Sequence, residues 1–94
     1  MQLLGLFKPD DFKRKHADSR GPLDVWQIEV EQARWCGPQD IKNRYPNASF
    51  LSENRVIFNI KGNTFILVVK VRYKNGVVLV EWVGTHSEYD KRKF

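Results

Sequence analysis

Residues 55–85, RVIFNIKGNTFILVVKVRYKNGVVLVEWVGT, decide the fold of this chain. Three runs in this stretch are rich in β-branched and aromatic residues and have the length of strands: 55–61, 64–73 and 77–84. Gly62-Asn63 and Asn75-Gly76 separate the runs, and Asn and Gly tolerate the positive φ that tight hairpin turns require. The stretch therefore predicts three consecutive antiparallel strands.

The first turn predicts the register of the first two strands. A two-residue turn at Gly62-Asn63 pairs Lys61 with Thr64. On one face, which we expect to be the core, the pairs are then Ile60 with Phe65, Phe58 with Leu67, and Val56 with Val69. On the opposite face the pairs are Asn59 with Ile66, Ile57 with Val68, and Arg55 with Lys70.

The second turn predicts the register of the third strand in the same way. A two-residue turn at Asn75-Gly76 pairs Lys74 with Val77. The core side then has Val71 with Val80 and Val69 with Trp82. The other side has Arg72 with Leu79, Lys70 with Glu81, Val68 with Val83, and Ile66 with Thr85. We therefore expect Trp82 in the core and Glu81 beside Lys70.

The first half of the chain predicts a short strand and three helices. Leu3–Phe7 is a short apolar strand candidate, and Pro9-Asp10-Asp11 opens a helix, because proline and carboxylates both suit a first turn. Gly21-Pro22 starts a second helix with apolar residues every three or four positions, and Cys36-Gly37 ends it. A third, short helix is expected at Gln39–Arg44.

Composition limits the class of protein. The 94 residues, 41% hydrophobic, suit one domain spanning positions 1–94. The net charge of +5 favours acidic partners, nucleic acid first among them. The single cysteine, Cys36, excludes a disulfide framework or a cysteine zinc site within one chain. Met1–Phe7 is too short for a signal peptide, and no apolar run approaches the roughly 20 residues of a membrane helix. We expect a cytoplasmic protein that does not engage a membrane.

The predicted register collects cations on the face opposite the core. Arg55, Lys70 and Arg72 share that face, and Arg55 lies directly opposite Lys70. Like charges in this position destabilise a sheet by up to about 1 kcal/mol, which Glu81 can partly offset for Lys70. The pair either binds an anion or extends into water, and both interpretations remain open.

A second group lies at one end of the predicted sheet. Neighbouring strands are about 4.8 Å apart, so His86 is expected within about 10 Å of Lys61. Tyr89 lies three residues further on in a final helical turn. RNA cleavage without a metal needs deprotonation of a ribose 2′-hydroxyl, charge stabilisation at the phosphate and a proton for the leaving oxygen. His86 and Tyr89 suit proton transfer or orientation, and Lys61 and Arg55 suit the phosphate. A capping histidine and a packing tyrosine are the alternatives.

Metal and cofactor chemistry find no support in the sequence. His16 and His86 are far apart, and His16 ends a basic helix, where the helix dipole accounts for it. The chain has no tight cluster of Asp, Glu and His, no phosphate-binding glycine loop and no dinucleotide fingerprint. We expect no metal and no cofactor.

Four segments carry a family resemblance. DIKNRYPNASFL at 40–51, NRVIFNIKGN at 54–63, LVV at 67–69 and VGTHSEYDK at 83–91 together resemble the HigB family of type II toxins, within the RelE/ParE-like superfamily. Trp26 in the second helix is also in place. The combination of NRVIFNIKGN with VGTHSEYDK makes the resemblance specific.

The resemblance implies a fold and a function. The fold is α+β and RelE-like: an N-terminal strand and helices pack on one face of a mainly antiparallel sheet of about four strands. The function is that of a bacterial toxin that cleaves mRNA, usually on the translating ribosome, and that is paired with a HigA-like helix-turn-helix antitoxin. Its motif positions imply catalytic roles for Lys61, His86 and Tyr89. Together with the predicted register, the motifs indicate Arg55, Asn59, Lys70 and Arg72 as RNA-binding residues.

One position departs from the family pattern. Superfamily RNases often have a phosphate-binding arginine near position 66, where this chain has Ile66 on the predicted non-core face. This departure predicts a ribonuclease of weakened activity. It also favours an alternative: a non-nuclease relative that poisons DNA gyrase, as the ParE branch does, or that only binds an antitoxin. The basic tail Lys91–Phe94 either contacts ribosomal RNA or is a frayed terminus.

Overall fold

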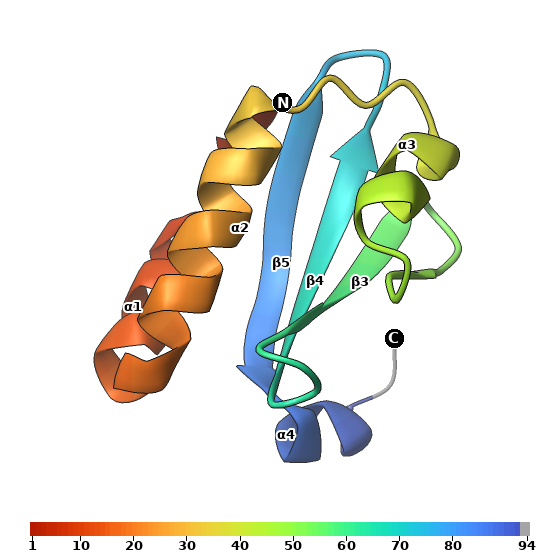
Figure 1. The fold of residues 1–94 in the computed structure, drawn as a ribbon. Helices are drawn as coiled ribbons and strands as arrows, with labels where there is room; N and C mark the ends of the chain where they lie inside the picture. The colour runs from red at the N-terminus through yellow and green to blue at the C-terminus, as the bar shows by residue number, and fades with distance from the viewer. Residues whose placement is uncertain (93–94) are drawn as a thin grey trace.

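A computed structural model describes residues 1–92, in which the first three α-helices pack on one face of a five-stranded sheet and the last α-helix lies at its end (Figure 1). The elements in chain order are β1 (Gln2–Leu4), α1 (Phe7–Lys15), a 3-10 turn (Ala17–Ser19), α2 (Arg20–Gln32), α3 (Pro38–Arg44), β2 (Ser49–Phe50), β3 (Arg55–Ile60), β4 (Phe65–Arg72), β5 (Val77–Thr85) and α4 (His86–Asp90). The strand order is β1-β5-β4-β3-β2, with β1 parallel to β5 and the other pairs antiparallel. The expected α+β class is confirmed, with β2 as an additional edge strand.

The predicted register of the first hairpin is confirmed. All six pairs from Arg55 opposite Lys70 to Ile60 opposite Phe65 are present. The backbone turns at Lys61 and Gly62, which have φ of 53° and 65°. The apolar side chains of this hairpin on one face therefore point to the helices, as the alternation predicts.

The predicted register of the second hairpin is wrong by two residues. Arg72 pairs with Val77 and Val71 with Val78, so the connecting loop has four residues, Tyr73 to Gly76. A two-residue turn of this kind needs positive φ at both central positions. Gly76 adopts it, with φ of 67°, but Asn75 does not. The chain therefore turns through the longer loop.

A β-bulge then shifts the register again. Val69 lies opposite Val80 and Val68 opposite Trp82, so that Glu81 faces no residue of β4. The prediction that Trp82 belongs to the core is therefore wrong. Trp82 packs on the opposite face of the sheet, and Val83 turns toward the core instead.

The second helix is shorter than predicted. It ends at Gln32, and Ala33 is already extended with ψ of 154°. The amino group of Met1 donates hydrogen bonds to the carbonyls of Val30 and Ala33, at 3.1 and 2.6 Å. A positive group here satisfies carbonyls that a helix end leaves without partners. The predicted strand Leu3–Phe7 also shortens, because Phe7 already begins α1.

The sheet has apolar residues on both faces. The main core lies between the helices and the sheet, and its largest fully buried side chains include Leu23, Ile41 and Phe58. We call the other side the open face, because α1, α2 and α3 do not cover it. It carries a smaller group, here called the open-face cluster: Ile57, Ile66 and Val68, packed against Leu51, Trp82 and Tyr89.

Gly5 allows the close approach of the β1–α1 connection to β5. Its φ is 77°, and a Cβ at this position would lie 2.6 Å from the carbonyl oxygen of Val80. We expect Gly5→Ala to lower the free energy of unfolding by about 2 kcal/mol or more. Gly62→Ala is the matched control, because Gly62 has φ of 65° but nothing within 4 Å of the added Cβ. It should cost about 1 kcal/mol. Urea unfolding measures both, and equal losses would contradict the steric argument.

Candidate functional site

One end of the open face carries three cations. Arg55, Lys70, Leu79 and Leu4 form one row across β3, β4, β5 and β1. Arg72 lies two residues along β4 from Lys70 and is exposed. The structure therefore brings together the three predicted RNA-binding cations Arg55, Lys70 and Arg72, which we call the basic group.

The bulge gives Arg55 a carboxylate partner. Nε of Arg55 donates to Oε1 of Glu81 at 2.9 Å, and a nitrogen of the same guanidinium lies 3.6 Å from Oε2 of Glu53. The predicted pairing of Glu81 with Lys70 is wrong, because Leu79 lies opposite Lys70. The carboxylate of Glu81 thus offsets the charge of Arg55 and so reduces the repulsion between Arg55 and Lys70.

Two of the predicted catalytic residues, Lys61 and His86, lie at the end of the sheet away from the basic group. His86 begins α4, and its backbone N–H donates to the carbonyl of Thr64 at 3.1 Å. This bond holds the start of α4 against the β3–β4 turn, in which Lys61 lies. Lys61 and His86 are therefore at the same end of the sheet, as the sequence predicts.

Both of these side chains are exposed and have acidic neighbours. Nζ of Lys61 donates to Oδ2 of Asp18 at 3.1 Å, and this bond lowers the pKa of the Asp18 carboxyl. Nδ1 of His86 lies 3.2 Å from Oδ2 of Asp90, one helical turn further on. The second contact fixes the orientation of the imidazole ring.

Tyr89 and Asn59 have packing and structural contacts. The ring of Tyr89 lies 6.1 Å from that of Trp82 and covers part of the open-face cluster. Nδ2 of Asn59 donates to the carbonyl of Asn47 at 3.2 Å and ties β3 to the preceding loop. Both residues lie where the sequence analysis expected, but their roles in RNA binding or cleavage stay predictions.

A reciprocal cap holds α4. The hydroxyl of Thr85 accepts from the N–H of Glu88 at 3.1 Å, and the Glu88 carboxylate accepts from the N–H of Thr85 at 2.8 Å. The bond to the Thr85 N–H lowers the pKa of Glu88. The VGTHSEYDK motif therefore includes the signals that start the helix carrying His86.

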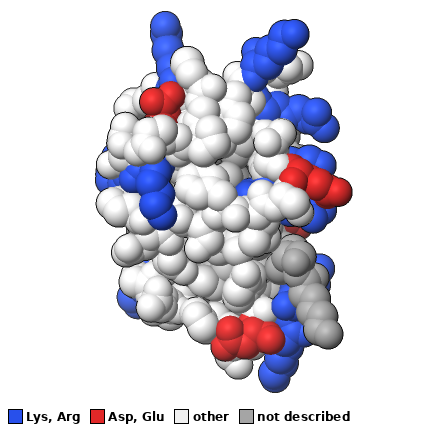
Figure 2. All heavy atoms as spheres, turned by 90° about the vertical axis from the view of Figure 1, so that its right-hand side faces the viewer, with Lys and Arg blue, Asp and Glu red and all other residues white. Residues whose placement is uncertain are grey.

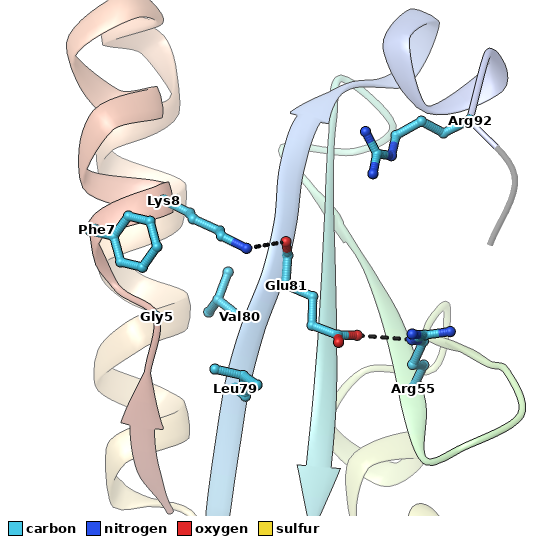
Figure 3. Close-up of a pocket in the computed structure, with 8 residues that line it drawn as sticks. All are labelled: Gly5, Phe7, Lys8, Arg55, Leu79, Val80, Glu81 and Arg92. Carbon is cyan, nitrogen blue, oxygen red and sulfur yellow. Dashed lines mark hydrogen bonds and ion pairs between the residues drawn. The ribbon is translucent and has the colours of Figure 1, made fainter.

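Three further residues adjoin the basic group. The sequence did not point to Phe7 or Lys8 as site residues, and it pointed to Arg92 only as part of the basic tail. Phe7, Lys8 and Arg92 line a cavity of about 460 Å³ together with Arg55 and Glu81 (Figure 3). Lys8 lies at the start of a helix and Arg92 follows the last helix, so only the tertiary fold brings them to Arg55. Of the basic tail Lys91–Phe94, for which RNA contact and a frayed terminus are both open interpretations, Lys93 and Phe94 lie outside the described residues.

The surface at the β3 side of the molecule has an uncharged centre. Figure 2 shows this side, where Lys and Arg side chains stand mostly around the border of a broad uncharged area. Residues 1–92 contain no group of three or more His, Cys, Asp or Glu side chains placed to hold a metal ion. In the same residues no helix is long and apolar enough to cross a bilayer.

Comparison with known families agrees with this arrangement. A family model described as HigB toxin, the RelE-like toxic component of a toxin–antitoxin system, matches residues 19–92. The chain belongs to the HigB toxin family. As such a component, this HigB-family toxin has an antitoxin as its partner. No curated protein is a significant match to the sequence.

Ile66 of this toxin is a buried residue. Its side chain is 2% exposed in the open-face cluster, opposite Asn59 and Gly84. An arginine at this position would have to enter the cluster or displace Trp82 and Tyr89. Ile66 therefore has a packing role in the cluster against which Tyr89 of α4 rests.

We expect Ile66→Arg to lower the free energy of unfolding by roughly 3–5 kcal/mol, because it places an unpaired charge among apolar side chains. Leu79→Arg is the matched control: Leu79 is also on the open face but is 38% exposed. Its cost should stay below about 1 kcal/mol. Urea unfolding compares the two variants. An Ile66→Arg protein that is as stable as wild type would show that the cluster readily opens.

The cap of α4 predicts a pH dependence. Since the pKa of Glu88 is lower in the folded toxin than its ordinary value of 4.5, its stabilising effect is complete above that value. It is lost as the pH falls through the folded pKa. Glu88→Gln should lack this part of the acid sensitivity, and Glu31→Gln, an exposed carboxylate on α2, should behave as wild type. Thermal unfolding at a series of pH values tests this, and parallel curves for all three proteins would contradict it.

Proposed function

We propose that this toxin is an endoribonuclease that cleaves mRNA on its open face. The observation that carries the proposal is the placement of Arg55, Lys70 and Arg72 on that face of a HigB-family toxin, with His86 at its end. Lys70 and Ile66 are four residues apart along β4, a distance of about 13 Å along the strand. A single strand of RNA bound by the basic group can therefore extend to His86.

The proposed reaction is a transesterification. The ribose 2′-oxygen forms a bond to the neighbouring phosphorus and gives its proton to a base, while the bond from phosphorus to the 5′-oxygen breaks. The leaving oxygen takes a proton, so the products are a 2′,3′-cyclic phosphate and a 5′-hydroxyl. His86 serves one end of this proton transfer as a general acid or base.

The neighbouring residues would support this chemistry. Since Asp90 lies at Nδ1 of His86, Nε2 is the nitrogen that faces the substrate. Lys61 would stabilise the charge that develops on the phosphate, exchanging Asp18 for the RNA. We assign Tyr89 to positioning, because its ring packs against Trp82 and holds α4 to the sheet.

Several further parts of the proposal rest on the resemblance of the motifs to known HigB toxins. We propose that cleavage needs no metal ion and takes place on translating ribosomes in the cytoplasm. We also propose that the antitoxin is HigA-like and carries a helix-turn-helix domain.

We expect His86→Ala to reduce RNA cleavage about 100-fold or more, since a general acid or base contributes this much. Lys61→Gln should reduce it about tenfold, because a hydrogen bond from a charged group is lost while the side chain keeps its length. Growth after induced expression and the rate of transcript cleavage measure both effects. The matched controls are Ser87→Ala on the same helix and Lys74→Gln in the other hairpin loop, and both should remain toxic. Full toxicity of both site variants would show that the proposed site is wrong.

A further inference from the structure

The cavity beside the basic group has the chemical character of a nucleotide site. It lies between the start of α1, the bulge of β5, Arg55 and Arg92 (Figure 3). Its volume of about 460 Å³ falls within the roughly 300–1,000 Å³ of small-ligand sites. Leu79 and Arg55, which flank Lys70 in the row across the sheet, both line it. The cavity is therefore continuous with the basic group.

Three cations and one carboxylate line this cavity. Lys8 donates from Nζ to the backbone carbonyl of Glu81 at 2.7 Å, which holds the ammonium at the bulge. An ammonium has three donors and a guanidinium has five, so Lys8 and Arg55 can bind an anion while keeping their bonds to Glu81. The excess of positive charge favours a phosphate.

An aromatic ring stands at the edge of the same cavity. Phe7 is 71% exposed, more than any other large apolar side chain in residues 1–92. Nζ of Lys8 lies 5.7 Å from the centre of its ring. A phenylalanine left in water gains little from folding, but an exposed ring beside cations is the combination on which single-stranded nucleic acids stack their bases.

We propose that this cavity binds one nucleotide of single-stranded RNA, with its phosphate among Lys8, Arg55 and Arg92 and its base stacked on Phe7. The inference rests on the proposed function and extends it by a second contact region away from His86. Stacking and phosphate contacts do not read base edges, so the site should add affinity without selecting a sequence.

The test is the binding of a fluorescent RNA of about eight nucleotides with 2′-O-methyl riboses, which the proposed reaction cannot cleave. Phe7→Ala should weaken binding about 5- to 150-fold with an unchanged salt dependence, because a lost stack removes no phosphate contact. Phe7→Trp should bind as wild type or more tightly. Arg92→Gln should reduce the slope of log K against log salt by about 0.7.

The chain offers a matched control pair. Lys42 lies over the ring of Phe50 at 5.9 Å and donates to the carbonyl of Ala48 at 2.9 Å, which repeats the Lys8–Phe7 arrangement in another part of the molecule. Phe50→Ala and Lys42→Gln should leave RNA binding unchanged. Thermal unfolding should confirm that the exposed Phe7 can be replaced without loss of the fold.

Two results would overturn the inference. The first is that Phe7→Ala binds RNA as wild type does. If this variant also fails to bind the antitoxin, the cavity is a protein-binding site. The second is that Phe50→Ala weakens binding as much as Phe7→Ala. Failure of the proposed function is distinguishable from both, because wild type would then bind RNA through Phe7 but cleave no transcript.

Discussion

The extra residue in β5, Glu81, determines how side chains are distributed on the open face. No residue of β4 lies opposite Glu81, so beyond Val80 the alternation of side chains between the two faces is shifted by one residue. Trp82 thereby moves to the open face, covers Ile66 and Val68, and provides the ring against which Tyr89 packs. The bulge also supplies two acceptors: the Glu81 carbonyl binds Lys8 and its carboxylate binds Arg55. This one extra residue thus determines contacts of β5 with α1, with β3 and, through Trp82, with α4.

The open face is consequently divided into regions of different chemistry. The basic group and the cavity beside it can hold phosphates and a base, whereas the proposed proton-transfer residue, His86, lies beyond the open-face cluster. An apolar cluster between these regions excludes water and gives α4 a firm support, and the Thr85–Glu88 cap fixes where that helix begins. Ile66, which in the sequence resembles a lost phosphate ligand, is part of this support. The division separates binding from chemistry in our account of the toxin.

Local signals in the sequence predicted the first hairpin, the α+β class and the neighbourhood of Lys61 and His86. The Gly62 turn and the period-two alternation of β3 and β4 depend on nearby residues and can therefore be read from the chain. The register of β5 could not, because Asn75-Gly76 is compatible with loops of two or four residues, and a bulge at Glu81 has no signature of its own in an apolar strand. The contributions of Lys8 and Arg92 also could not be predicted, since the parallel pairing of β1 with β5 and the position of α4 bring them to Arg55. The family motifs identified the catalytic candidates but not the packing around them.

The most direct test of this account is a map of transcript 5′ ends after the toxin is induced in cells that lack its antitoxin. The account predicts new ends within translated messages, carrying 5′-hydroxyl groups, and their disappearance in the His86→Ala protein. Growth arrest with DNA damage and without such ends would contradict it and would favour the gyrase-poisoning alternative. Growth arrest with new ends that persist in His86→Ala would preserve the nuclease and reject the site.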